Sequence, residues 1–317
     1  MPLPLRLDQD RPRIDAALSS ALAGDSLLLE IARYHVGVGD DSGSEAKRLR
    51  PALVLLVASE LGGNDARGLD AAVAIELVHS FSLVHDDIED GDSERRGRET
   101  VWVRYGVAQA INAGDLLAAL GGRHAFRAGR EEARVLVEAT AEMVEGQGKD
   151  VAWEGVEVGV EDYLGMIDQK TGALLRASLD LGAIAADAPR TLRTDLAAFG
   201  ADLGRAFQIK DDLEDTRGRG SDLERRKATL PLSIAWERAS ERDRALLLRS
   251  VGSGRDLSLE ESEEVRDVLE RSGARDAAQA IARRHLDRAR ERLEDLPFTS
   301  EGKGALGELL AELGSLR

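Results

Sequence analysis

A long stretch without proline limits what this chain can fold into. No proline occurs between Pro51 and Pro189, and the stretch is rich in Ala, Leu, Glu and Arg, which favour helices. Apolar residues recur at helical spacing, for example at Val73 and Leu77, while alternating β-branched runs between turn residues are missing. The sequence therefore predicts an all-α fold, with one helix beginning near Asp70.

Glycine-containing segments mark the expected breaks between helices. They are Gly62-Gly63, Gly91, Gly121-Gly122, Gly146–Gly148 and Gly252–Gly254. None resembles a long linker, and the chain contains neither an internal repeat nor a low-complexity segment. We therefore expect a single domain over residues 1–317.

Composition excludes several classes of function. The formal net charge of −16 argues against nucleic acid as a partner, because phosphate backbones are bound by basic surfaces. No apolar run has the length of a transmembrane segment, and the first residues lack a signal-peptide pattern. Cysteine is absent, which excludes disulfides and thiolate metal ligands. We expect a soluble, cytoplasmic protein.

An acidic pattern occurs twice, each time at the end of an apolar helical stripe. The residues are Asp86, Asp87 and Asp90 in the first cluster and Asp211, Asp212 and Asp215 in the second. Carboxylates four residues apart lie on one helical face and repel each other by a few tenths of a kcal/mol. A hard cation such as Mg²⁺ cancels this repulsion and commonly shares its ligands with phosphates.

The alternative is an ordinary solvated acidic face, since Asp and Glu make up 59 of 317 residues. A single acidic cluster would not decide between the two interpretations. The repetition of the pattern, each time after core-facing apolar residues, favours a pair of metal-binding sites facing a cavity.

Basic residues lie close to the first cluster in sequence. Lys47 and Arg50 precede a predicted helix, where free N–H groups assist anion binding. Arg95 and Arg96 follow the cluster after a short turn and carry guanidinium groups suited to bidentate contact with phosphate. His79 lies two helical turns before Asp86 on roughly the same face. Taken alone, it would be a structural histidine.

Together these segments resemble the trans-isoprenyl diphosphate synthases, the family of farnesyl and geranylgeranyl diphosphate synthases. The matching segments are Lys47–Pro51, Glu76–His79, His85–Asp90, Arg95–Gly97, Ala110–Asp115, Gly146-Gln147, Lys170–Leu174, Phe207–Asp212 and Lys227–Pro231. The resemblance implies an orthogonal bundle of antiparallel helices around a central deep pocket, usually as a homodimer.

The resemblance also implies a set of site residues. The six aspartates would hold about three Mg²⁺ ions on an allylic diphosphate, which Arg95, Lys170 and Lys227 would also contact. Lys47, Arg50, His79 and Arg96 would bind isopentenyl diphosphate. Thr171 and Gln208 would present oxygens to the allylic cation formed when the C–O bond breaks. The released diphosphate would take the final proton.

Three positions depart from the family pattern. Glu45-Ala46 replaces a usual Gly-Gly pair, which places a carboxylate beside the isopentenyl diphosphate site. The loop after the second cluster is short, so that Arg219 is the candidate for a lysine of the family. Glu99 replaces a frequent proline. None of these changes removes a predicted metal ligand.

Product length is predicted from the residues before Asp86. A helix rises about 5.4 Å per turn, so Ser82 and Phe81 lie one turn deeper in the expected pocket. The small Ser82 would let the growing chain pass, and the ring of Phe81 would stop it. This arrangement resembles the archaeal-type geranylgeranyl synthases and favours a C20 product, with C15 as the second choice. Alternatively, Phe81 packs into the core and another helix forms the floor.

Three other functions compete with the synthase. A class I terpene cyclase needs no isopentenyl diphosphate site, and its pocket is rich in aromatic residues, which make up only 3% here. A regulatory subunit of a synthase typically lacks one aspartate cluster, whereas both are present. A generic acidic helical binding protein would leave the basic motifs unexplained.

Overall fold

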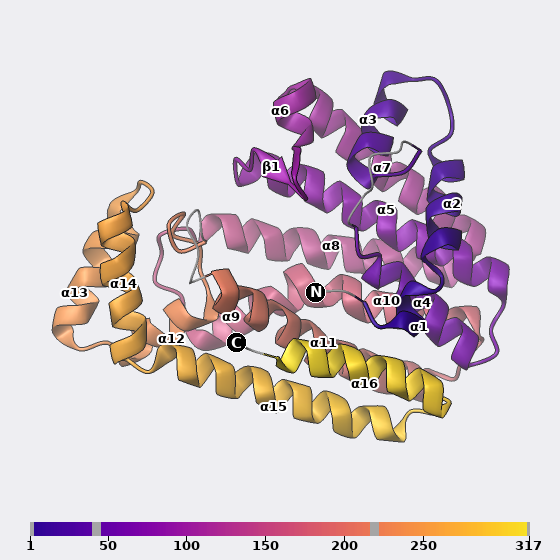
Figure 1. The fold of residues 1–317 in the computed structure, drawn as a ribbon. Coiled ribbons are helices and arrows are strands. Elements are labelled where there is room, and N and C mark those ends of the chain that lie inside the picture. Colours follow the sequence, from indigo (N-terminus) through magenta and orange to yellow (C-terminus); the bar gives the residue numbers. More distant parts are fainter. Residues whose placement is uncertain (1–2, 40–45, 216–221, 316–317) are drawn as a thin grey trace. The chain divides into compact units, whose positions relative to one another are not determined.

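A computed structural model describes residues 3–39, 46–215 and 222–315 (Figure 1). By their contacts the residues group into two compact units. Unit 1 comprises Met1–Ala141, Leu174–Ala198 and Glu294–Leu309, and unit 2 comprises Glu142–Ala173, Phe199–Leu293 and Leu310–Arg317. The single domain, and a deep pocket at its centre, stay predictions.

Almost all regular structure in the described residues is helical, which confirms the all-α prediction. Unit 1 contains α1 (Leu5–Asp8), α2 (Arg11–Ala21), α3 (Leu27–Val36), α4 (Leu49–Glu60), α5 (Asp65–Glu89), β1 (Glu94–Arg95), β2 (Arg98–Glu99), α6 (Val101–Tyr105), α7 (Val107–Ala128) and most of α10 (Ala173–Ala185). Unit 2 contains α9 (Val160–Ile167), the π-helix η1 (Asp168–Gly172), α12 (Leu230–Arg238), α13 (Glu241–Ser250), the 3₁₀-helix η2 (Val251–Ser253), α14 (Leu259–Arg271) and most of α15 (Ala274–Asp295). Residues of α8 (Arg130–Ala152), α11 (Arg190–Asp215) and α16 (Ser300–Gly314) belong to both units. No helix among the described residues is long and apolar enough to cross a membrane.

The core of unit 1 forms where α5 and α7 pack side by side (Figure 1). α5 begins at Asp65, earlier than the start near Asp70 predicted from the sequence. The reason is Asn64, whose side chain accepts a hydrogen bond from the Arg67 N–H at 3.0 Å and so caps the helix. The whole of the segment that ends in the first aspartate cluster is therefore one continuous helix.

Two glycine segments predicted as helix breaks lie inside helices instead. Gly121-Gly122 is in the middle of α7, and Gly146–Gly148 is within α8. A Cβ on Gly121 would lie 2.9 Å from Val78 Cγ2 and 3.0 Å from the Ala74 carbonyl oxygen on α5. This glycine is therefore present because the two helices approach closely there.

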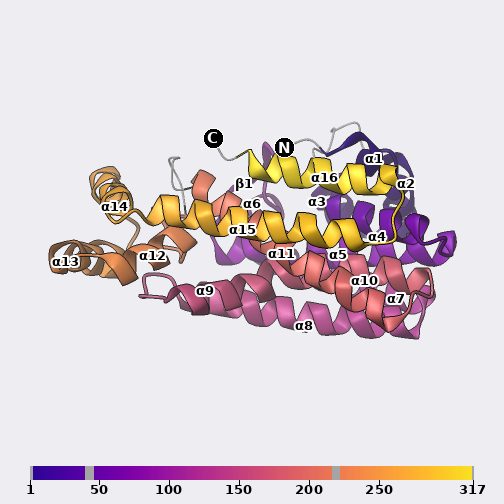
Figure 2. The same ribbon diagram turned by 90° about the horizontal axis from the view of Figure 1, so that it is seen from below.

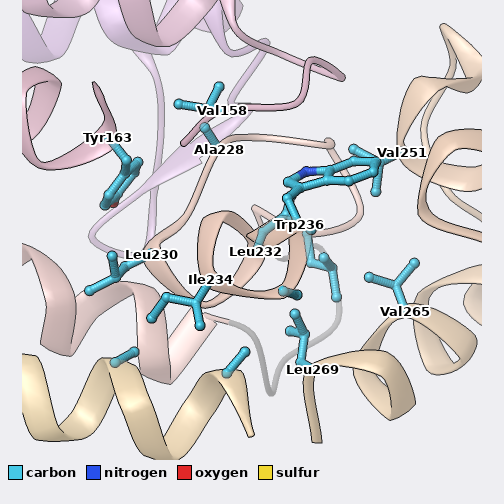
Figure 3. Packing of buried hydrophobic residues seen from close by; sticks show 14 of the residues in the cluster. Val158, Tyr163, Ala228, Leu230, Leu232, Ile234, Trp236, Val251, Val265 and Leu269 are labelled. Carbon is cyan, nitrogen blue, oxygen red and sulfur yellow. The ribbon is translucent and has the colours of Figure 1, made fainter. Parts of the chain in front are cut away.

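Unit 2 is built around a separate apolar cluster (Figure 3). The indole of Trp236 on α12 lies next to Val251, and Val265 and Leu269 approach from α14. Figures 1 and 2 show α12, α13 and α14 grouped together. This core fixes α12, and with it the segment before α12 that carries Lys227.

Candidate active site

The first aspartate cluster lies at the carboxyl end of α5, in unit 1. Asp86 and Asp90 are partly exposed, whereas Asp87 is 0% exposed. Asp87 Oδ1 accepts a hydrogen bond from Arg95 Nε at 2.6 Å. The negative end of the helix dipole adds to the charge of the three carboxylates. The end of α5 therefore gathers negative charge, only part of which is paired with Arg95.

The second oxygen of Asp87 supports a cation at this position. Oδ2 is buried, and no described residue forms a hydrogen bond with it. Burial raises the pKa of Asp87 to about 6, although Arg95 acts in the opposite direction. A buried carboxylate oxygen without a donor is costly, and a nearby Mg²⁺ would offset that cost. This donor set, all oxygens, fits Mg²⁺.

A short hairpin holds Arg95 and Arg96 beside the cluster. β1 and β2 pair Glu94 with Glu99 and Arg95 with Arg98. Arg96 and Gly97, at the turn, both have positive φ, 54° and 73°, as a two-residue type I′ turn requires. The hairpin therefore presents adjacent guanidinium groups next to the aspartates.

Tyr34 of α3 holds this hairpin from one side. Its hydroxyl donates to the Glu99 carbonyl oxygen at 2.8 Å, and the Arg98 guanidinium stacks on its ring at 4.0 Å. Tyr34 was not predicted from the sequence, because an aromatic residue on a helix gives no signal of such a contact.

The predicted residues for isopentenyl diphosphate also lie in unit 1. Arg50 Nη1 donates to His79 Nε2 at 3.0 Å, and Lys47 is exposed. Desolvation and the guanidinium groups of Arg50, Arg96 and Arg95 lower the pKa of His79 well below its usual value. His79 is thus neutral, in a setting whose positive charge suits an anion.

Phe81 and Ser82 are partly exposed on α5. The Ser82 hydroxyl donates to the His79 carbonyl oxygen at 2.9 Å. The Phe81 ring packs edge to face on His85, with 4.9 Å between ring centroids. His85 in turn fits against Gly114 of α7, where a Cβ would collide with the imidazole. The role of Phe81 as a chain-length floor stays a prediction.

The second aspartate cluster ends α11, in unit 2. Asp211 is partly exposed and Asp215 is exposed, but Asp212 is only 2% exposed. Asp212 Oδ2 accepts from the Tyr163 hydroxyl at 2.5 Å and from the Leu230 N–H at 2.9 Å. Burial raises its pKa to about 7, against the effect of these hydrogen bonds. Asp212 therefore anchors the end of α11 to α9 and α12, and its predicted metal binding stays a prediction.

Lys170 and Thr171 lie in the π-helix η1. π-Helical turns are rare and occur frequently at functional sites. The Thr171 hydroxyl donates to Gln208 Oε1 at 2.7 Å, and Gln208 Nε2 donates to Asp212 Oδ1 at 3.1 Å. The structure thus joins Thr171 to Gln208 and links both to the second cluster, while their predicted role toward the allylic cation stays a prediction.

Asp150 is a further candidate site residue, which the sequence analysis does not predict. It is 5% exposed, and its Oδ2 lies 2.6 Å from Lys170 Nζ and 3.7 Å from Lys227 Nζ. The carboxylate thereby holds two predicted diphosphate ligands together. Asp150 follows the matching segment Gly146-Gln147 by about one helical turn, and this position was the available signal.

Two predicted features cannot be placed, because Glu45 and Arg219 lie outside the described residues. Among the residues that are described, no group of three His, Cys, Asp or Glu side chains is arranged to hold a metal ion by itself. Mg²⁺ often keeps several waters and binds through one or two carboxylates and substrate phosphates.

Comparison with known proteins gives the family. A sequence model of the polyprenyl synthetases matches residues 28–270. A (2E,6E)-farnesyl diphosphate synthase of Mycobacterium tuberculosis is 38% identical over 285 residues, which cover 83% of this chain and 79% of that protein. The chain therefore belongs to the polyprenyl synthetase family. The family resemblance predicted from the sequence is confirmed.

Solved structures agree with this assignment. A geranylgeranyl pyrophosphate synthetase from Pyrococcus horikoshii has a TM-score of 0.87 and 34% identity, with 98% of each chain covered. A polyprenyl synthase from Caulobacter crescentus, crystallised with calcium and isoprenyl diphosphate, has a TM-score of 0.88 and 26% identity, again with 98% of each chain covered. The all-α fold is thus that of the family.

Proposed function

We propose that this protein joins isopentenyl diphosphate to an allylic diphosphate and releases a longer trans-polyprenyl diphosphate. As a polyprenyl synthetase, it is a transferase, a trans-prenyltransferase of the short-chain type. The observation that carries the proposal is the pair of aspartate clusters, which end α5 and α11 and lie near basic side chains, Arg95 at the first and Lys227 at the second. A class I terpene cyclase would not require the isopentenyl diphosphate site, and a generic binding protein would require neither the acidic nor the basic set.

The aspartates would hold the metal. Asp86 and Asp90, together with Asp211 and Asp215, present partly or fully exposed carboxylates, and Asp87 adds a buried oxygen that suits a nearby cation. About three Mg²⁺ ions is the number that the family resemblance implies. When bound, Mg²⁺ stabilises the negative charge that develops on the leaving diphosphate. The calcium in the Caulobacter relative supports a divalent cation.

The basic residues would bind the allylic diphosphate directly. Lys170 and Lys227 both lie near one carboxylate oxygen of Asp150, and Arg95 pairs with Asp87. Donors placed before the reaction stabilise developing charge without reorganisation. Thr171 and Gln208 present oxygens to the allylic cation, and the released diphosphate removes the last proton.

Isopentenyl diphosphate would bind at Lys47, Arg50, His79 and Arg96. Neutral His79 can donate one hydrogen bond without adding charge, while the arginines supply forked donors. Holding the second substrate beside the cation turns the condensation into an effectively unimolecular step.

We favour a C20 product, with C15 as the alternative. Relatives of similar identity carry both names, farnesyl for one and geranylgeranyl for another. Phe81 is not buried in the core; it lies partly exposed, one turn before Asp86, which supports its role as the floor of the pocket. A class I terpene cyclase is a weaker alternative, because it would not need the Arg50 and His79 pair.

A homodimer is also proposed. Apolar side chains are exposed along α7, at Val107, Ile111 and Phe126, and along α8, at Val137 and Val144. A homodimer formed through these two helices would cover such side chains. A cytoplasmic location stays a prediction from the sequence.

One assay tests the proposed function. The protein is incubated with Mg²⁺, isopentenyl diphosphate and each of the C5, C10 and C15 primers, and the dephosphorylated alcohols are separated by chromatography. We expect a C20 alcohol, and we expect Asp86→Ala to reduce turnover at least about a hundredfold with the fold intact. Glu89→Ala, an exposed neighbour on the same helix, is the control. The absence of product with every primer would refute the proposal.

A further inference from the structure

Arg48 lies between two predicted ligands of isopentenyl diphosphate, yet its side chain is enclosed by the protein. It is 3% exposed, whereas Lys47 is exposed and Arg50 is partly exposed. Three basic residues of one motif therefore have different environments. Arg48 cannot be a ligand of the substrate in the way that its neighbours can.

All three guanidinium nitrogens of Arg48 are used by the fold. Nε donates to Asp15 of α2, Nη1 donates to Glu76 of α5, and Nη2 donates to the carbonyl oxygen of Val36 of α3, each at 2.8 Å. One side chain thus fastens the start of α4 to three other helices of unit 1. This planar fork is a geometry that lysine cannot reproduce.

The backbone of Arg48 explains why such fastening is needed. Arg48 is the N-cap of α4 and has φ 55°, in the left-handed region. This conformation is uncommon for residues other than glycine and persists only where surrounding contacts enforce it. The bend at Arg48 sets the directions in which Lys47 and Arg50 leave the chain.

The ion pair between Arg48 and Glu76 also neutralises a buried negative charge. Glu76 is 3% exposed and lies one helical turn before His79 on α5. An unpaired carboxylate there would attract the nearby cations and repel a diphosphate. The contact with Arg48 neutralises it.

We propose that Arg48 is a positioning residue for isopentenyl diphosphate: it holds Lys47 and Arg50 in their binding directions and neutralises Glu76. The proposal rests on the proposed function, because it assigns the site at Lys47 and Arg50 to that substrate. It predicts that damage at Arg48 weakens the use of isopentenyl diphosphate while leaving the allylic primer little affected.

The test compares Arg48→Met, Arg48→Lys and Glu76→Gln in steady-state kinetics with both substrates varied. We expect both Arg48 variants to raise the KM for isopentenyl diphosphate about tenfold or more, with the KM for the primer changed less than about twofold. Glu76→Gln keeps an acceptor for Nη1 and should stay within about threefold. A raised KM for isopentenyl diphosphate in Arg48→Lys, which keeps the positive charge, would show that the geometry of the guanidinium group matters as well as its charge.

The control is Arg193→Met, which breaks ion pairs of Arg193 with Asp180 and Glu131 in the same unit, neither of which is a proposed ligand. It should lower the melting temperature without changing either KM. Asp15→Ala removes one contact of Arg48 at a side chain that is 39% exposed, so this variant should fold even if the Arg48 variants do not. We expect about a threefold rise in its KM for isopentenyl diphosphate.

An unchanged KM for isopentenyl diphosphate in every folded variant would overturn the proposal. If the wild type itself makes no product, the proposed function has failed instead.

Discussion

At the scale of single residues, the two aspartate clusters share a division between exposed and buried carboxylates. The second aspartate of each cluster is enclosed: Asp87 binds Arg95, and Asp212 binds Tyr163 and the Leu230 N–H. The sequence predicted both clusters from their spacing. It could not predict this division, because the partners come from other elements whose approach is set by tertiary packing.

Phe81 gives a prediction about product length. Replacing its ring with the methyl group of alanine should remove the floor of the pocket, so Phe81→Ala should shift the main product from C20 to longer alcohols, as measured by chromatography. Leu83→Ala, on another face of α5, serves as the control. An unchanged product distribution would show that another helix sets the chain length.

His35 gives a prediction about pH. Burial, and then the positive charges of Arg96, Arg95, Arg48 and Arg98, lower its pKa from 6.5 to about 3. In the unfolded chain His35 therefore becomes protonated below pH 6.5, whereas in the folded chain it stays neutral until about pH 3. Stability from this group is present above pH 6.5 and is lost as the pH falls.

The measurement is urea unfolding of the wild type and His35→Gln at pH 7 and pH 5. The free energy of unfolding of the wild type, relative to His35→Gln, should fall by up to about 2 kcal/mol between these two values. The comparison with His35→Gln is necessary because the raised pKa of Asp87 increases the free energy of unfolding as the pH falls, in the wild type and in the variant alike. A constant difference would contradict the burial of a neutral His35.

At the scale of helices, the sequence predicts where helices form but not why some glycines lie inside them. Helical periodicity predicted the helices that carry both clusters. The sequence predicts that Gly121 and Gly146 break helices, because glycine weakens an isolated helix. In the fold they occur where a neighbouring segment comes too close for a side chain, and such proximity is a property of tertiary structure.

Gly146 supplies a prediction for this scale. A Cβ there would collide with the backbone of Lys170 in η1, so Gly146→Ala should displace the π-helix and destabilise the protein by about 1–3 kcal/mol. Turnover should fall as well, because Lys170 and Thr171 move. Gly148→Ala on the same helix, where a Cβ meets nothing within 4 Å, should be neutral or stabilising. Equal behaviour of the two variants in melting and turnover would refute the packing explanation.

At the scale of the whole molecule, the sequence was sufficient for the family, because many motifs occur in the family's order. It was not sufficient for assembly, since a surface residue is recognised only once the core is known. Phe126 and Val137 are 75% and 63% exposed, and neither could be distinguished from a core residue in the sequence.

Introducing charged residues at the exposed apolar positions of α7 and α8 tests the proposed homodimer. Placing carboxylates there should prevent burial of the apolar side chains, so Phe126→Glu combined with Val137→Glu should sediment as a monomer where the wild type sediments as a dimer. Leu5→Glu, at an apolar residue that is 85% exposed on α1, is the matched control and should leave the dimer intact. A wild type that is monomeric at micromolar concentration would contradict the proposal.

The central claim is that both aspartate clusters act on one diphosphate. The most direct measurement is a crystal structure with Mn²⁺ and an unreactive thio-analogue of an allylic diphosphate, with anomalous diffraction recorded to locate the metal. We predict Mn²⁺ peaks that are shared between the diphosphate and carboxylates of both clusters, including Asp86 and Asp211. Metal at only one cluster, or an analogue bound away from both, would contradict the account.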